Sequence, residues 1–340
     1  MLSNVASVRA AFTLLLSATL TLTSVAAEKD HVVVYTSVDE ILSAEIFNRI
    51  EEQTGLDIRP VYDSEATKTT GLYLRLIEEK NRPRADVFWN SEFSRTLLLK
   101  KEGVLARHDS EAVRSIPEKY RDSEGYWTGL SLRARVLAYN SDLLSASDVP
   151  RSATELLDPK WKGKIAWANP MFGTTGTHCG ALLAVLGEGV FTNLVGSWAD
   201  QFHELPSNGQ VANFVARGTF PLGITDTDDV WRLRASGRPI DHVPFDFDGR
   251  GTLLIPNTVA LIKGAPNEGP GRRFIDALFD PQVERFLAFS TSRQLPVRPD
   301  VEIPDELEPW RSVPSLDVRY EDVAENVDQA LKITRKILLK

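Results

Sequence analysis

The first part of the chain alternates short apolar runs with segments of helical periodicity. Residues 31–35 (HVVVY) are apolar and β-branched, which predicts a buried strand. Apolar residues then recur at helical spacing over residues 41–50, and Gly55 is placed to end that helix. Residues 57–62 and 85–89 are predicted as two further strands, with a helical pattern between them. This order of strand, helix and strand predicts an open α/β sheet.

The second part of the chain repeats this order. Residues 164–168 (KIAWA) and 220–224 (FPLGI) are apolar runs that predict strands. A glycine–threonine segment at residues 173–176 begins one helical pattern, and an acidic segment at residues 225–229 begins another. We therefore predict an α/β fold of two lobes, each a mostly parallel sheet flanked by helices.

Two longer strand patterns separate these blocks. Residues 135–139 and 252–262 are strongly apolar, and we interpret them as the segments that cross between the lobes. The first lobe is then discontinuous, with residues 28–132 and 251–310 in lobe 1 and residues 133–250 in lobe 2. An amphipathic helical pattern within residues 311–340 is expected to pack on lobe 1.

Polar residues gather where the predicted strands end. In open α/β sheets, ligands bind outside the carboxyl ends of the strands, so the loops at these ends are the expected binding site. The candidate ligand-binding residues in these loops and in the return crossing are Thr36, Ser37, Ser64, Glu65, Thr67, Asn90, Thr174, Thr175, Thr225, Asp226, Asp228 and Asn257. Several of them precede helices, where hydroxyl groups and free N–H groups can receive an anionic oxygen or simply cap the helix.

The same loops are rich in acids. The expected cleft collects Asp39, Glu65, Glu92, Asp226, Asp228 and Asp229, with Lys68 as the one obvious cation. Buried carboxylates are costly without a positive partner, so such a cleft should prefer a metal cation or an amine. The alternative for each acid at a helix start is to complement the helix dipole. Acids on one side and N–H groups on the other fit a metal–anion pair or a zwitterionic amine.

The N-terminus and the composition limit the possible functions. Residues 1–27 carry Arg9, an apolar stretch and small residues at positions 25–27, the pattern of a cleaved secretory signal. A formal net charge of −8 argues against nucleic acid and anionic membranes as partners, because both are bound through Lys and Arg. With a single cysteine, Cys179, no intrachain disulfide can form, so stability should come from a sizeable core.

Five sequence segments together resemble one protein family. They are VVYTS at 33–37, QTG at 53–55, RPRADVFW at 82–89, WKGKIA at 161–166 and IPNTVALIKGAP at 255–266. They resemble the periplasmic substrate-binding proteins of ABC importers, in the class 1 solute-binding family that includes ferric-iron-binding proteins. The resemblance implies two α/β lobes of the type II periplasmic-binding-protein fold that close around a ligand, a periplasmic location, a membrane permease as partner and a monomeric chain.

The resemblance also implies positions for a metal site. Ferric-binding members hold iron through a His in the first loop, a Glu after the third strand and two adjacent tyrosines in the second lobe. These positions fall here at Asp39, at Ser91 or Glu92, and near Asp228 and Asp229, and no Tyr-Tyr pair occurs in the chain. Carboxylate oxygens are also hard ligands suited to hard cations. The metal-ligating candidates are therefore Asp39, Glu92, Asp228 and Asp229.

Two classes of function remain from the sequence. The leading hypothesis is a non-catalytic binding protein that delivers a small solute to a permease, with ferric iron or another hard metal as the transported ligand and an accompanying anion. An amine-bearing solute such as an aminophosphonate, a polyamine or thiamine is the alternative cargo. The rival class is an exported enzyme on the same fold, although the chain has no H-E-x-x-H or G-x-S-x-G motif.

Overall fold

The computed structural model describes residues 30–63 and 69–339. The predicted signal segment at residues 1–27 and the candidates Ser64, Glu65 and Thr67 lie outside the described residues. Within the described ranges, no helix is both long and apolar enough to cross a lipid bilayer.

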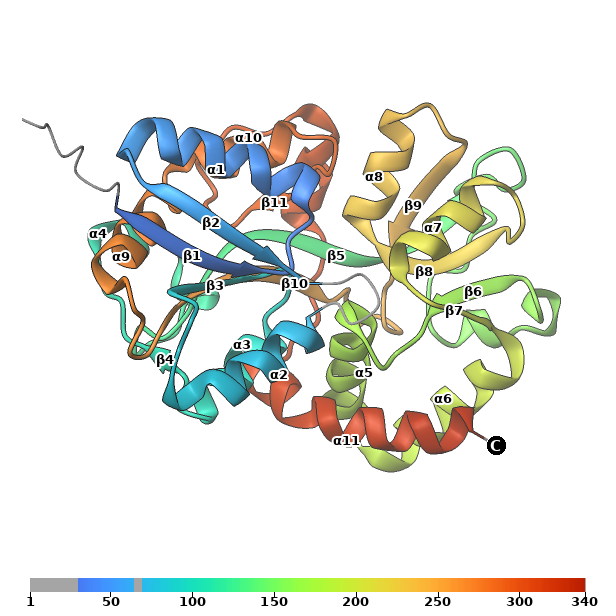
Figure 1. The fold of residues 1–340 in the computed structure, drawn as a ribbon. Coiled ribbons are helices and arrows are strands. Elements are labelled where there is room, and N and C mark those ends of the chain that lie inside the picture. Colours follow the sequence, from blue (N-terminus) through green and yellow to red (C-terminus); the bar gives the residue numbers. More distant parts are fainter. Residues whose placement is uncertain (1–29, 64–68, 340) are drawn as a thin grey trace, which may run out of the picture.

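The strands and helices follow the predicted alternation (Figure 1). The strands are β1 His31–Thr36, β2 Asp57–Tyr62, β3 Val87–Asn90, β4 Leu105–Ala106, β5 Thr128–Asn140, β6 Ile165–Ala168, β7 His203–Leu205, β8 Leu222–Asp226, β9 Ile240–Pro244, β10 Leu254–Ile262 and β11 Leu295–Pro296. The α-helices are α1 Glu40–Thr54, α2 Thr70–Glu78, α3 Ser94–Lys101, α4 Glu111–Arg114, α5 Gly173–Leu186, α6 Glu188–Gln201, α7 Asn208–Ala216, α8 Thr227–Ala235, α9 Glu268–Leu278, α10 Pro281–Phe289 and α11 Tyr320–Leu338.

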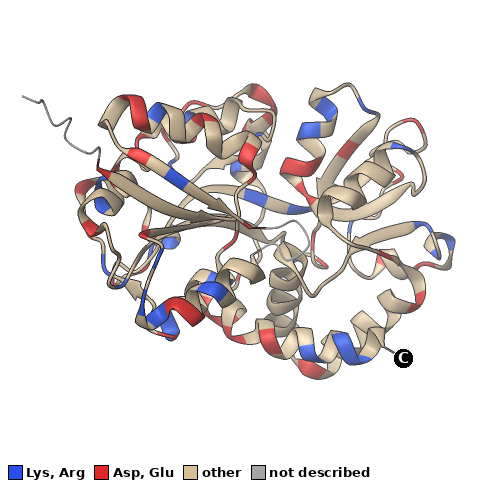
Figure 2. Ribbon diagram, in the orientation of Figure 1, with Lys and Arg blue, Asp and Glu red and all other residues tan. Residues whose placement is uncertain are grey.

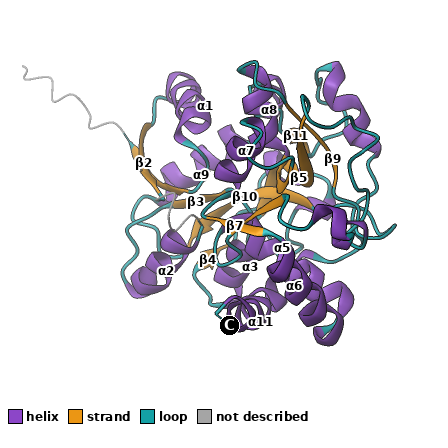
Figure 3. Ribbon diagram, turned by 90° about the vertical axis from the view of Figure 1, so that its right-hand side faces the viewer, coloured by secondary structure: helices purple, strands orange, loops and turns teal. Residues whose placement is uncertain are grey.

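The sheet confirms the predicted α/β class and its two lobes. Strand order is β2-β1-β3-β10-β5-β8-β6-β7, with β4 on β10 and with β9 and β11 on β5. Strand β1 pairs in parallel with β2 and β3, and β6 pairs in parallel with β7 and β8. We call strands β1–β4, β10 and β11 with their helices the first lobe, and strands β6–β9 with theirs the second lobe. Helices lie on both faces of the strands (Figure 3).

Strand β5 joins the lobes. Its first part, through Ala134, pairs with β10 and β11, whereas its second part, from Arg135 onward, pairs with β8 and β9. The return toward the first lobe runs beside it, where the backbone N–H of Arg135 donates to the carbonyl of Leu253. The sequence pattern anticipated crossing segments at these places, and β5 is longer than the pattern indicated. The exact residues that divide the lobes stay a prediction.

Helices α5 and α11 form part of the contact between the two lobes. Helix α11 packs chiefly on α5, and it also contacts α6 and α3. Helices α5 and α6 belong to the second lobe and α3 to the first, so the expected packing of α11 on the first lobe is only part of what the structure shows. The main hydrophobic core runs from Tyr35 and Phe93 through Tyr320 and Val323 of α11 to Trp198. The lobes are therefore joined by a buried apolar layer as well as by β5.

Local sequence explains where the site-forming helices start and stop. Helix α1 ends at Gly55, which adopts φ 72° and donates its N–H to the carbonyl of Glu51. A left-handed residue is the common end of a helix, and glycine adopts it without a steric penalty. Helix α8 begins directly after β8, with Asp226 in extended conformation at the N-cap position. This abrupt strand-to-helix change places three aspartates at one end of α8.

Candidate functional site

A cavity of about 450 Å³ lies between the ends of β1 and β3 and the start of α8. Thr36 and Ser37 at the end of β1 line it from the first lobe, and Thr174 and Asn208 line it from the second lobe. It occupies the carboxyl ends of the parallel strands, as the sheet rule predicts. Residues from both lobes thus face one polar space.

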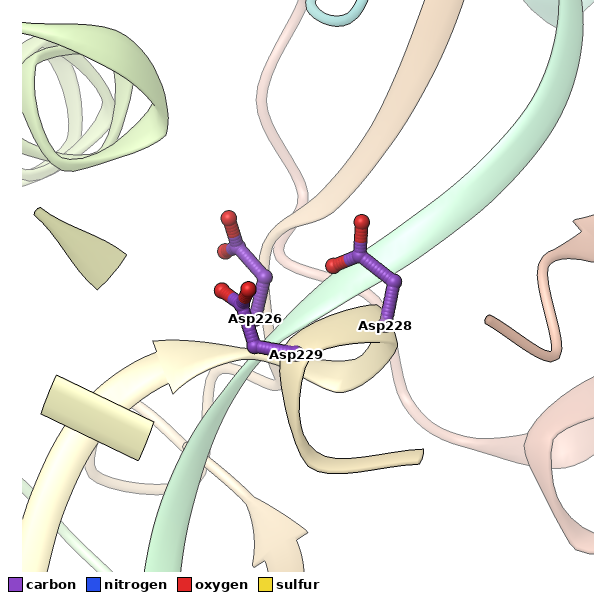
Figure 4. A group of neighbouring side chains, drawn as sticks. All are labelled: Asp226, Asp228 and Asp229. Atoms are coloured by element: carbon purple, nitrogen blue, oxygen red, sulfur yellow. The ribbon is translucent and has the colours of Figure 1, made fainter. Parts of the chain in front are cut away.

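Three aspartates form the most concentrated group of acids in this space. Carboxylate oxygens of Asp226, Asp228 and Asp229 lie within 4.8 Å of one another, and all three residues are buried. Figure 4 shows the three side chains projecting from the start of α8. Carboxylates this close repel one another unless cations or hydrogen-bond donors compensate them.

Asp226 is compensated inside the second lobe. Arg135 donates from Nη1 to Asp226 Oδ1 over 2.7 Å, and neither side chain is more than 2% exposed. The hydroxyl of Thr174 and the side-chain amide of Asn208 donate to Asp226 Oδ2. Both oxygens of Asp226 are therefore bound within the protein, which makes this aspartate a structural anchor at the base of the cavity.

Asp228 faces Arg133 of β5. Arg133 Nη1 donates to Asp228 Oδ2 over 3.0 Å, and Nη2 donates to the backbone carbonyl of Ser91 in the first lobe over 2.6 Å. Burial alone would lower the pKa of Arg133, but Asp228 and then Asp226 outweigh it and raise the pKa above its usual value. Asp228 Oδ1 is buried and has no hydrogen-bond partner among the described residues. This oxygen is thus available to a bound cargo.

Asp229 and Asp39 share one arginine. Arg232 Nη2 donates to Asp229 Oδ1 over 2.7 Å, and Nη1 donates to Asp39 Oδ2 over 2.8 Å. Burial would lower the pKa of Arg232, but Asp229, Asp228 and Asp39 together raise it. Asp39 takes the N-cap position of α1 without a side-chain cap bond. Its carboxylate reaches across to the second lobe instead.

The cavity is therefore of mixed charge and not simply acidic. Figure 2 shows acidic and basic positions together on α8. Lys68 lies outside the described residues. The expectation that it is the one obvious cation was wrong, because Arg133 and Arg232 line the cavity and Arg135 lies buried against Asp226. Such a surface can offer carboxylate oxygen to a positive group and guanidinium N–H to a negative one.

The structure brings part of the candidate set to the cavity. The candidates that line it are Thr36, Ser37, Asp39, Thr174, Asp226, Asp228 and Asp229. Asn257 lines a small adjoining recess with Arg133 and Asp228. Its amide oxygen accepts from the Trp89 indole over 3.0 Å, so it also holds β10 against β3.

Other candidates support the cavity wall from behind. Asn90 accepts the Ser37 hydroxyl over 2.7 Å, and Thr175 donates to Asn208 over 3.0 Å. Thr225 donates to Asp229 Oδ2 over 3.0 Å. These residues orient groups that face the cavity. Their own direct contact with a ligand stays a prediction.

Glu92 occupies a different environment from the one expected of a metal ligand. Its fully buried carboxylate accepts from the backbone N–H groups of Ser94 and Arg95 at the start of α3. It also accepts from the Asn90 amide and from the Thr177 hydroxyl of α5, over 3.1 and 2.9 Å. The structure therefore places Glu92 at the buried contact between the lobes and outside the cavity lining.

The arginines of the site, Arg133, Arg135 and Arg232, were not predicted from the sequence, although two sequence features indicate them. Arg133 and Arg135 are the charged residues of strand β5 and stand at alternate positions, so both point to one face and require partners. Arg232 lies three and four residues after Asp229 and Asp228, the spacing at which helical side chains meet. The spacing could have indicated the pair with Asp229. The contact with Asp39 could not be predicted from spacing, because the two residues are 193 positions apart in the chain.

Comparisons with known proteins agree with this architecture. The chain is 25% identical over 272 residues to "Iron uptake protein A1" of Synechocystis sp., covering 77% of this chain and 74% of that protein. It is 27% identical over 266 residues to a "Putative 2-aminoethylphosphonate-binding periplasmic protein" of Salmonella typhi, covering 71% and 74%. The solved structure of a ferric binding protein from Campylobacter jejuni superposes with a TM-score of 0.82 at 20% identity, over 90% of this chain and 99% of that chain.

These relatives are named as binding or uptake proteins and not as enzymes. The likeness to the solved structure establishes the two-lobed fold. Residues 83–322, more than half of the chain, match the family described as bacterial extracellular solute-binding proteins. The chain therefore belongs to the bacterial extracellular solute-binding protein family.

Proposed function

We propose that this protein is the periplasmic solute-binding component of an ABC importer and that it captures a small cargo between its two lobes. The observation that carries the proposal is the 450 Å³ cavity, which takes charged and hydroxyl side chains from both lobes. A ligand that contacts both sides favours the closed arrangement by its differential affinity for that arrangement. A membrane permease is the partner that this role requires.

The proposed cargo is ferric iron or another hard metal, carried with an anion. Asp228 Oδ1 offers a buried, unpartnered carboxylate oxygen, and a carboxylate oxygen of Asp229 lies within 4.8 Å of one of Asp228. Oxygen donors suit hard cations. Arg133 and Arg232 would face the accompanying anion, because guanidinium groups form charge-assisted hydrogen bonds with its oxygens. The iron uptake relative supports this choice of cargo.

A zwitterionic amine such as an aminophosphonate is the second candidate cargo. The observation that favours it is the pairing of Asp228 and Asp229 with arginines, which gives the cavity alternating charges. An ammonium group would contact Asp228, and a phosphonate would contact a guanidinium and the helix starts. The relative named for 2-aminoethylphosphonate binding supports this alternative.

Calorimetric titration of the chain from residue 28 onward tests the proposal. The titrants are ferric citrate, with and without carbonate, and 2-aminoethylphosphonate. We expect ferric iron to bind and Asp228→Asn to weaken it by about 10- to 100-fold, the loss typical of one charge-assisted contact.

Asp241→Asn is the matched control, because Asp241 pairs with Arg234 and does not line the cavity. If the aminophosphonate binds and ferric iron does not, the zwitterionic amine becomes the proposed cargo in place of the metal. Turnover of a titrant, or no binding of either cargo class, would contradict the proposed role.

A further inference from the structure

Arg232 connects the two lobes across the cavity. Its guanidinium donates to Asp229 on its own helix and to Asp39 at the start of α1, 193 residues away in sequence. Figure 1 shows the start of α1 and helix α8 on facing sides of the two lobes. One planar side chain thus binds a carboxylate from each lobe.

The two carboxylates that Arg232 holds also belong to the proposed cargo site. Asp39 and Asp229 line the same cavity as Asp228. A guanidinium between two carboxylates supplies the positive charge that a cargo cation would supply at the same oxygens. Arg232 therefore serves both lobes as an internal counter-cation.

We propose that Arg232 is a latch that holds the two lobes closed by bridging Asp39 and Asp229, and that a cargo cation takes over this bridging role. This inference rests on the proposed function, because it concerns the regulation of the same site. In the closed, cargo-free protein, Asp39 and Asp229 already bind the Arg232 guanidinium. A weakly charged solute cannot displace it from them. A cargo must then provide enough charge to replace the guanidinium.

The contact between Arg232 and Asp39 is partly exposed to solvent, so it should break and form again easily. The side chains of Arg232 and Asp39 are 33% and 32% exposed, whereas the Arg135–Asp226 pair is almost fully buried. Ion pairs at partly exposed sites are modest in strength and are screened by salt. We therefore expect the latch to shift the ratio of closed to open protein about two- to fivefold.

Distances between two spin labels measure this ratio directly. Exposed positions Asn48 on α1 and Arg238 after α8 can each be changed to cysteine, and the native Cys179 is buried. In cargo-free protein at low salt, Arg232→Gln should increase the population with a long interlobe distance. Raising the salt concentration should move the unsubstituted protein in the same direction and leave Arg232→Gln unchanged.

The control is Arg234→Gln, because Arg234 is on the same helix but pairs with Asp241 inside the second lobe. Asp39→Asn should open the protein as Arg232→Gln does, and the double variant should open it no further. Saturating ferric citrate should return Arg232→Gln to the closed distance. Equal distance distributions for Arg232→Gln, Arg234→Gln and the unsubstituted protein would overturn the latch. Failure of ferric iron to bind any variant would count against the proposed function, while the cargo-free distances would still decide the latch.

Discussion

The two lobes meet in two regions of opposite character. On the cavity side, Arg232 and Asp39 form a partly exposed ion pair beside an open polar space. On the opposite side, helix α11 packs against both α5 and α3, and Glu92 of the first lobe accepts a buried hydrogen bond from Thr177 of α5. Buried apolar surface and fully satisfied polar groups fix a contact, whereas a hydrated ion pair can open at small cost.

The side of the molecule formed by α3, α5 and α11 contains further close contacts. The α3–α5–α11 side has a glycine, Gly180, whose absent side chain lets α11 approach: a Cβ there would lie 2.7 Å from Val327 Cγ2. The Ser94 hydroxyl also meets Thr177 there, over 3.2 Å. We expect this region to stay assembled while the cavity side opens and closes.

The largest expected effect comes from the buried pair at the base of the cavity. Asp226→Ala should lower the free energy of unfolding by about 3–5 kcal/mol, because it leaves the Arg135 charge buried without its partner. Urea unfolding followed by circular dichroism measures this change. Asp241→Ala removes a more exposed pair with Arg234 and should cost less than about 1 kcal/mol. Equal losses in the two variants would mean that burial does not separate structural from surface acids here.

The next effect tests the close helix contact. Gly180→Ala should lower the free energy of unfolding by about 1–3 kcal/mol, because the new methyl group would overlap Val327 Cγ2 and the Val323 carbonyl. The control is Gly196→Ala in α6, where nothing lies within 4 Å of the added Cβ. That change should be neutral or stabilising, since alanine favours helix. A neutral Gly180→Ala in thermal and urea unfolding would show that α5 and α11 are loosely packed.

The free energy of unfolding should depend on pH, because a histidine of helix α5 is buried. His178 of α5 packs against Trp198 and Phe245, and burial, followed by the charge of Arg135, lowers its pKa well below the usual value. The unfolded chain binds a proton at this residue near pH 6.5, and the folded protein does so only at lower pH. Stability from this group is therefore present above about pH 6.5 and decreases as the pH falls, by at most about 1.4 kcal/mol per pH unit.

Urea unfolding at a series of pH values measures that slope. His178→Gln should reduce it, whatever its effect on stability at pH 7.5. Burial also lowers the pKa of His242, so part of the slope should remain in this variant. His203→Gln, at an exposed position, is the control. An unchanged slope in His178→Gln would contradict a neutral, buried imidazole at this site.

The smallest expected effect on stability comes from the latch itself. Arg232→Gln should change the free energy of unfolding by less than about 1 kcal/mol, because Arg232 and Asp39 are each about one-third exposed, and the buried Asp229 keeps the Thr225 hydroxyl as a donor. Differential scanning calorimetry checks this value. A loss comparable to that of Asp226→Ala would make Arg232 a core residue and remove the contrast between the two regions.

The pattern of residues along the chain is enough to predict the order of strands and helices and the edge of the sheet where polar groups gather. Apolar runs and helical spacing report which positions are buried, and these patterns are local. The three aspartates at the start of α8 were found together for the same reason, since residues 226–229 span one strand-to-helix turn. Thr36 and Ser37 followed from the position of the first strand.

The partners of these acids depend on contacts between segments that are far apart in the chain. Arg135 meets Asp226 and Arg133 meets Asp228 because β5 crosses from one lobe to the other, and Arg232 reaches Asp39 because the lobes face each other. Periodicity identifies a buried face, but it does not specify which charges on distant segments meet, since that depends on strand order. Glu92 shows the same limit. The sequence identifies it as an acid after the third strand, but its role as a buried hydrogen-bond acceptor depends on the start of α3 and on Thr177 of α5, which donate to its carboxylate.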